Sequence, residues 1–156
     1  MREILFRGKR THNDDWIVGS LHIEKFTDDE EYLCCEICQC DVYPETVGQY
    51  TGLTDKNGTK IFEGDILRYF VWGAYECFAI VRIGEYEQDG SGDEYPAIKI
   101  CGVYAEVKKY CPLIKEDGDY FPEYLRKSSL LEIGKENFEL FGNIHDNPEL
   151  LKGGAE

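Results

Sequence analysis

Residues 45–69 read ETVGQYTGLTDKNGTKIFEGDILRY, and this stretch carries the densest turn signals in the chain. Asp55-Lys56-Asn57-Gly58 predicts a tight hairpin turn, because Asn and Gly tolerate the positive φ angles that such turns require. The surrounding glycines lack the spacing of nucleotide-binding loops, so we interpret them as residues that serve the geometry of the backbone. Residues 66–71 then read as a β-strand, which makes the whole stretch a turn between strands of a sheet.

The composition extends this prediction to the rest of the chain. The 156 residues suffice for one domain or two small modules, and they include 8 Phe, 11 Tyr and 2 Trp, which favour sheet over helix. We therefore predict a mainly β fold with an N-terminal β-hairpin region, a small SH3-like β-barrel and a short C-terminal helix. The expected boundaries are 1–53 for the first region, 54–152 for the barrel and 153–156 for a disordered tail, with one continuous domain as the alternative.

The N-terminal region should open with a hairpin. Strands are expected over 4–7 and 16–23, joined by the polar turn at 11–15, with Trp16, Val18 and Leu21 facing the core. The acidic run 28–31 predicts a loop, since adjacent like charges repel one another. A further strand should then run through the cysteine-rich segment to Tyr43, where Pro44 ends it.

The C-terminal region should contain longer strands, expected over 75–86 and 95–107 and joined by a loop at 88–93. In the first of them both faces are partly apolar, which predicts a strand inside a sandwich or barrel. Residues 108–127 read as an irregular segment with a turn at 116–119 and a short helix near Pro122. A closing strand over 138–144 should precede a one-turn helix at the capping sequence Asp146-Asn147-Pro148.

The chain is strongly acidic. Its 31 acidic and 17 basic residues give a net charge of −14, and residues 11–45 hold ten acids but Lys25 as their only base. Such a surface disfavours direct binding of nucleic acid, which relies on Lys and Arg to displace counterions. We interpret the acids as a solvated surface. The alternative hypothesis is an acidic mimic of nucleic acid that inhibits a host enzyme.

Seven cysteines in a chain without a secretion signal disfavour a disulfide framework. Four of them are clustered, and Cys35 and Cys38 have the spacing of half a zinc knuckle. Because Cys77, Cys101 and Cys111 stand singly, we interpret the cluster as small apolar residues in or beside a strand. A small zinc-binding module, completed by a histidine, remains the second alternative, and the sequence leaves open whether the cluster binds metal. The clustered residues are Cys34, Cys35, Cys38 and Cys40.

Catalysis is not indicated. His12, His22 and His145 are candidate bases, but no nucleophile motif accompanies any of them. The acid pairs Asp14-Asp15 and Asp117-Asp119 read as turn residues. We therefore assign no catalytic, cofactor-binding or metal residues and no cofactor. The chain also lacks an apolar run of about 18 residues that could span a membrane, so we expect a cytoplasmic protein of a bacterial host.

Three segments make the chain resemble the YopX family of small phage and prophage proteins: residues 1–19, which open with MREILFRGKR, residues 45–69, and ELFGNIHDNPELL at 139–151. The resemblance covers just over a third of the chain. It implies a mainly β fold, a phage setting and self-assembly, and it implies no catalytic residues. Our preferred hypothesis is an accessory protein that acts by contact with a host or phage protein, or as a homo-oligomer. The contacts would run through β-edges or through exposed aromatic residues such as Tyr69, Phe70 and Trp72.

Overall fold

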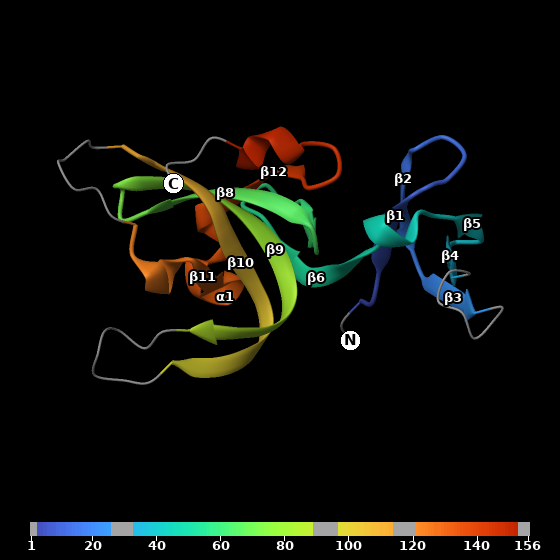
Figure 1. Ribbon diagram of the computed structural model, residues 1–156, viewed down its shortest axis with the longest axis horizontal. Helices are drawn as coiled ribbons and strands as arrows, with labels where there is room; N and C mark the ends of the chain where they lie inside the picture. Colours follow the sequence, from blue (N-terminus) through green and yellow to red (C-terminus); the bar gives the residue numbers. More distant parts are fainter. Residues whose placement is uncertain (1–2, 26–32, 89–96, 114–120, 153–156) are drawn as a thin grey trace. The chain divides into compact units, whose positions relative to one another are not determined.

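The computed structural model describes residues 3–25, 33–88, 97–113 and 121–152. It divides the chain into two compact units, Met1–Gly52 and Leu53–Glu156 (Figure 1). Strands predominate in both, which confirms the mainly β class. The predictions for the acidic run 28–31, the loop residues 89–93, the turn 116–119 with its pair Asp117-Asp119, and the tail 153–156 lie outside the described residues.

The first unit is built from short strands. β1, β2 and β6 belong to one sheet, in which β1 lies between β2 and β6. β3, β4 and β5 form a separate antiparallel sheet. A 3-10 helix, η2, precedes β6. The elements are β1 (Phe6–Lys9), β2 (Trp16–Gly19), β3 (Leu21–Lys25), β4 (Leu33–Ile37), β5 (Cys40–Asp41), η2 (Pro44–Thr46) and β6 (Gly48–Thr54).

The opening hairpin of β1 and β2 is confirmed, but two details of the prediction are wrong. The expected strand over 16–23 is two strands, β2 and β3, which belong to different sheets. The predicted phase is also inverted in β2: Ile17 packs against the core, whereas Val18 is 46% exposed. Trp16 lies instead under the Arg7 guanidinium, 4.8 Å from its ring centroid. This cation–π contact stabilises the ring away from the core.

The cysteine segment forms a hairpin and not the single strand that we predicted. Ile37 pairs with Cys40, so Cys38 and Gln39 are the two turn residues, with φ angles of 51° and 63°. Two successive positive φ angles define the type I′ turn that matches the twist of a two-residue hairpin. The core of this unit lies on one face of β4, where Cys35 and Ile37 are buried together with Val42.

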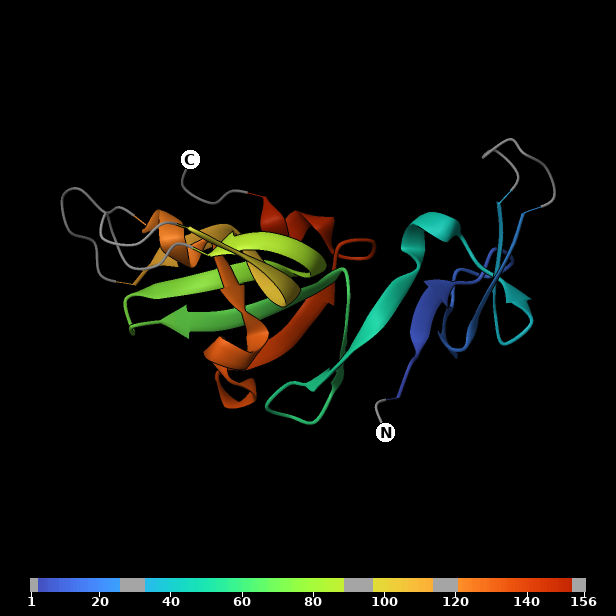
Figure 2. The same ribbon diagram turned by 90° about the horizontal axis from the view of Figure 1, so that it is seen from below.

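The second unit is a five-stranded antiparallel sheet in the order β11-β10-β9-β8-β12. Figures 1 and 2 show that β9 and β10 curve strongly, so that the sheet forms a half-barrel. An SH3-like barrel remains a prediction. The elements are β7 (Lys60–Phe62), β8 (Asp65–Val71), β9 (Tyr75–Gln88), β10 (Ile98–Pro112), η4 (Glu123–Leu125), β11 (Lys127–Ser129), α1 (Leu130–Ile133), η5 (Lys135–Asn137), β12 (Phe138–Asn143) and η6 (Pro148–Leu151).

Most strands of this unit agree with the sequence-based predictions, and β10 shows the main difference. It continues to Pro112, so residues 108–112 are not irregular as predicted. A register shift between Val107 and Lys109 lets the strand absorb Lys108 as a β-bulge and continue. The short helix near Pro122 and the C-terminal helix are confirmed as the 3-10 helices η4 and η6, whereas β11 and α1 were not predicted.

The main core lies on the concave face of this sheet. Cys77, Ala79 and Val81 of β9 are fully buried there, beneath Phe121 and Leu130. On the opposite face of β9, Phe78 and Ile80 are also buried, at 8% and 6% exposure. The predicted two-sided apolar strand is therefore confirmed.

The β9–β10 hairpin bends where two glycines face each other. Gly84 pairs with Gly102, Gly84 has a φ of 148°, and a Cβ on either residue would meet open space. Paired glycines permit a sharp bend, because they place no side chain on the strand surface. The rings of Tyr86 and Tyr104 stack beside the bend with centroids 4.5 Å apart. The arm beyond the bend is tied to α1 by a 2.8 Å hydrogen bond from Gln88 to Glu132.

The predicted turn at 55–58 is confirmed, and it does more than reverse the chain. The buried Asp55 carboxylate accepts hydrogen bonds from the backbone of Asn57 and Thr59, both at 2.9 Å, and from Leu140 of β12 at 3.0 Å. The Lys56 backbone also donates to the carbonyl of Phe138. The turn therefore covers the free edge of β12.

Candidate functional site

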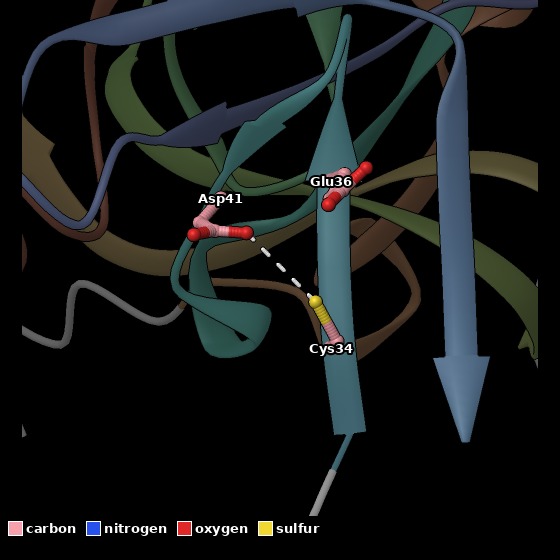
Figure 3. Close-up of side chains that lie close together, drawn as sticks. All are labelled: Cys34, Glu36 and Asp41. Carbon is pink, nitrogen blue, oxygen red and sulfur yellow. Dashed lines mark hydrogen bonds between the residues drawn. The ribbon is translucent and has the colours of Figure 1, made fainter. Parts of the chain in front are cut away.

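Potential metal ligands gather on the solvent face of the β3–β4–β5 sheet. Side chains alternate along β4, so Cys34 and Glu36 lie on the face opposite the buried Cys35 and Ile37. Asp41 is the cross-strand partner of Glu36. Figure 3 shows the three side chains together, and their ligand atoms all lie within 4.8 Å of one another.

The Cys34 thiol is held in its neutral form. It donates a weak hydrogen bond to Asp41 Oδ1 at 3.8 Å. Partial loss of hydration and the negative charges of Asp41 and Glu36 raise the pKa of the Cys34 thiol above its ordinary value. Since the thiolate is the nucleophile and the metal ligand, the free thiol has low reactivity unless a cation offsets the neighbouring carboxylates.

The same face extends to β3, where His22 lies opposite Glu36 and Glu24 lies opposite Cys34. His22 Nε2 is 3.6 Å from Glu24 Oε1. One sulfur, one imidazole and three carboxylates therefore occupy neighbouring positions in this sheet. This donor set fits a divalent metal ion such as Zn²⁺, which accepts sulfur, nitrogen and oxygen ligands.

The four clustered cysteines do not converge. Cys35 points into the core, while Cys38 is exposed at the turn with its Sγ 3.8 Å from the carbonyl of Val18. The spacing that suggested half a zinc knuckle thus separates a core residue from a turn residue. The sequence missed Glu36 and Asp41 as partners of Cys34, because only the hairpin pairing reveals them.

The remaining sequence candidates are dispersed. His12 lies in the exposed turn after β1, and His145 is half-buried after β12, where its backbone donates to Asn143 Oδ1 at 3.0 Å. Cys77 is in the main core, where burial raises the pKa of its thiol to about 12. Cys101 is exposed, and Cys111 is half-buried near the end of β10.

The second unit presents aromatic side chains on the convex face of its sheet. Phe70 is 48% exposed and Phe141 is 43% exposed, with the guanidinium of Arg68 at 5.3 Å from the first ring and 5.8 Å from the second. The Phe141 ring also lies 5.3 Å from that of Phe78, which Lys109 covers at 5.4 Å. We call this group the outer aromatic face; it comprises Arg68, Phe70, Phe78, Lys109 and Phe141.

Two acids balance the bases of the outer aromatic face. Arg68 forms ion pairs with Glu76 at 2.6 Å and with Glu139 at 3.1 Å, and Lys56 reaches Glu139 at 2.5 Å. These hydrogen bonds oppose the smaller effect of desolvation and hold the pKa of Glu139 below its ordinary value. The network fixes the orientation of Arg68 between the two exposed rings.

The three aromatic residues proposed from the sequence have different environments. Tyr69 is only 3% exposed, so its prediction as a contact residue is wrong. It alternates with Phe70 and therefore faces the core. Trp72 is 67% exposed at the tip of the β8–β9 hairpin, with a φ of 52° and its ring 6.2 Å from that of Tyr124. A bulky residue at positive φ is strained, and such strain is often found at functional sites.

Comparison with known proteins identifies the family. The pattern of the YopX protein family matches residues 5–95, which is more than half of the chain. The chain belongs to the YopX family. No curated protein matches this YopX chain. The crystal structure of protein EF1440 from Enterococcus faecalis has 20% sequence identity and a TM-score of 0.46, and the match covers 97% of the YopX chain and 100% of EF1440. At this TM-score the similarity supports no conclusion.

Family membership agrees with the resemblance seen in the sequence, and it assigns no activity to the YopX chain. Among the described residues, no helix is long and apolar enough to cross a membrane.

Proposed function

We propose that this YopX chain is a phage or prophage accessory protein in the cytoplasm of a bacterial host, that it acts by protein–protein contact, and that it pairs with a second copy through the outer aromatic face. The exposure of Phe70 and Phe141 beside one another supports this proposal. Aromatic and Arg side chains dominate the energetics of protein interfaces, and this face presents both.

Charge favours this face as the contact between copies. Two chains that each carry −14 repel one another at most orientations. Around the outer aromatic face, however, the bases Lys56, Arg68 and Lys109 stand against the acids Glu76 and Glu139. A locally balanced, aromatic surface is where two acidic chains meet the least electrostatic repulsion.

The free β-edges of the second unit are less suited to contact with another chain. At β12, the turn at 55–58 occupies the backbone groups of Phe138 and Leu140, so this edge cannot extend the sheet there. At the other end of the sheet, β11 is only three residues long. Short or covered edges resist pairing with another chain, which leaves the outer aromatic face as the better contact.

Sedimentation velocity at micromolar concentrations tests the proposal. We expect a dimer for the natural chain, a monomer for the double variant Phe70→Ser and Phe141→Ser, and a dimer for the control variant Leu131→Ser. Leu131 is 78% exposed on α1, outside the outer aromatic face, so it controls for loss of apolar surface. A natural chain that remains monomeric would refute self-pairing. A dimer that persists in the double variant would show that the outer aromatic face is not the contact between the copies.

A metal-binding module is the second candidate function, favoured by the convergence of Cys34, Glu36 and Asp41 within 4.8 Å. The measurement is zinc content after dialysis without chelator. We expect about one ion per chain in the natural protein and none in Cys34→Ser or Asp41→Asn. Zinc well below one ion per chain in the natural protein would exclude this function.

Acidic mimicry of nucleic acid remains a hypothesis without structural support. It requires the carboxylates of 11–45 and 85–94 to form a stripe, but residues 28–31 and the acids from Asp89 onward lie outside the described residues. Affinity capture of the tagged protein from its host tests it, since recovery of a single nucleic-acid enzyme would favour mimicry over self-pairing.

A further inference from the structure

The second unit contains a cavity of about 570 Å³ that the outer aromatic face does not include. One wall is the arm of the β9–β10 hairpin beyond the Gly84–Gly102 bend, at Glu87. The other walls are β10 at Glu106 and Lys108, and the segment from Tyr124 to Lys127. The cavity is thus lined in part by residues that lie beyond the bend. Its volume lies within the range of about 300–1,000 Å³ that small-molecule sites occupy.

The charge of this cavity is opposite to that of the chain. Acids outnumber bases by 31 to 17 in the sequence, yet the cavity is lined by the bases Lys108, Arg126 and Lys127 against the acids Glu87 and Glu106. A smaller cavity of about 230 Å³ shares Glu87 and Lys127 and adds the base Lys99 and the acid Glu85 to its wall. In the larger cavity bases outnumber acids by three to two, although acids predominate in the chain as a whole, and this local excess favours an anionic ligand.

The two lysines on the wall differ in their availability. Lys108 is the extra residue of the β10 bulge, and its ammonium lies 2.7 Å from Glu106 Oε1. Glu106 also accepts from Arg82 at 3.3 Å. Desolvation is the largest single effect and would raise the pKa of Glu106, but the hydrogen bonds and charges of Lys108 and Arg82 together outweigh it and lower that pKa. Lys127 has no ion pair within the described part of the chain. Its ammonium is the group best able to bind a ligand anion.

An aromatic ring forms part of the same wall. Tyr124 lines the cavity and is 40% exposed, and the Trp72 ring lies against it at 6.2 Å. A ring supported from one side and open on the other can stack on a planar group of a ligand. Basic groups beside an aromatic ring are the combination that recognises a phosphate attached to a planar ring system.

We propose that this cavity binds a small organic phosphate that carries a planar ring, of the size of a nucleoside monophosphate. Lys127 and Arg126 hold the phosphate, Tyr124 stacks on the ring, and Lys108 together with Glu106 forms the floor. The assignment does not depend on self-pairing, because the residues of the outer aromatic face do not line the cavity.

Isothermal titration calorimetry with adenosine monophosphate tests this inference. We expect binding by the natural chain, and a loss of about tenfold to a hundredfold in affinity in Lys127→Ala, since a hydrogen bond to a charged group typically contributes that much. Glu87→Gln should raise the affinity a few-fold by removing a negative charge that faces the phosphate. Lys135→Ala removes the same charge as the first variant from an exposed residue outside the cavity, and it should leave affinity unchanged.

Partial ligands separate the two parts of the proposed contact. Adenosine and inorganic phosphate should each bind more weakly than adenosine monophosphate, because each lacks one of the two groups. No binding of adenosine monophosphate at millimolar concentration would overturn the inference, as would equal weakening by Lys127→Ala and Lys135→Ala. Tighter binding of a 5′-phosphorylated oligonucleotide would overturn the assignment to a free small molecule.

Discussion

Replacing Asp55 should break the contact between the turn at 55–58 and β12. Its carboxylate is 3% exposed and accepts three backbone hydrogen bonds, from Asn57, Thr59 and Leu140. Hydrogen bonds to a charged group contribute about 1.5–3 kcal/mol each. Water can replace the carboxylate at the exposed turn residues Asn57 and Thr59, but less readily at the half-buried Leu140. We therefore expect Asp55→Ala to destabilise the second unit by about 3–5 kcal/mol.

Asp55→Asn is the sharper variant, because it keeps the shape of the side chain. Its carbonyl can still accept from Asn57 and Thr59, whereas its amide would direct a second donor at the backbone N–H of Leu140. The expected loss is about 2 kcal/mol, which corresponds to one charge-assisted hydrogen bond.

The loss of folding stability in Asp55→Asn should depend on pH in a defined direction. Desolvation would raise the pKa of Asp55, but the hydrogen bonds from Leu140, Thr59 and Asn57 outweigh it and lower the pKa. A carboxyl with a lowered pKa in the folded state stabilises the fold above its ordinary pKa of about 3.9, and this contribution disappears as the pH falls through the folded value. The difference between the natural chain and Asp55→Asn should therefore be constant from neutral pH to about pH 5 and shrink below about pH 4.

Urea unfolding followed by circular dichroism measures these differences, and hydrogen exchange of β9 and β10 assigns them to the second unit. The reasoning would be refuted by an Asp55→Asn variant within about 0.5 kcal/mol of the natural chain. A difference that stays unchanged at pH 3 would show that the carboxylate charge is not responsible.

Two further predictions concern the first unit. Gly19→Ala should destabilise it by about 1–3 kcal/mol, because the new Cβ would lie 2.1 Å from Cys38 Sγ. The same substitution in a Cys38→Ala background should cost less than about 0.5 kcal/mol; equal losses in both backgrounds, measured by urea unfolding, would contradict the proposed clash. Asp41→Asn should accelerate alkylation of Cys34 about two- to fivefold at neutral pH, since it removes a charge that raises the pKa of that thiol. Peptide mass spectrometry with Cys101, which is exposed in the other unit, as internal reference provides the rate, and an unchanged rate would contradict the electrostatic cause.

Sequence patterns predicted the second unit better than the first, for a physical reason. The long strands β8 and β9 have strong apolar alternation, and the Asn-Gly turn has a local chemical signature. In contrast, Trp16-Ile17-Val18 is apolar on both faces, so its phase depended on the Arg7 contact with Trp16, which no local pattern reveals. The turn at Cys38-Gln39 likewise lacks the Gly or Asn from which a tight turn would have been predicted.

The candidate sites were largely invisible in the sequence because they depend on pairing between segments. Asp41 meets Cys34 only after the chain reverses at residues 38–39. The cavity at Lys127 is lined by residues beyond the bend at two glycines and by the strand β11. This strand is too short to show a clear alternation of apolar and polar residues. Phe141 was missed as a contact residue because its partner Arg68 is distant in sequence, although its strand was predicted correctly.

The strand β6 has a consequence for how this chain can be divided or recombined. The boundary between the two units falls after Gly52, inside β6, whose first residues pair with β1 and whose other neighbour is β7. Residues on both sides of this boundary thus belong to the same strand. A crossover at the boundary itself would divide β6 between two parent sequences, so we expect viable chimaeras to have their crossover in the turn at 55–58 and to inherit β6 whole.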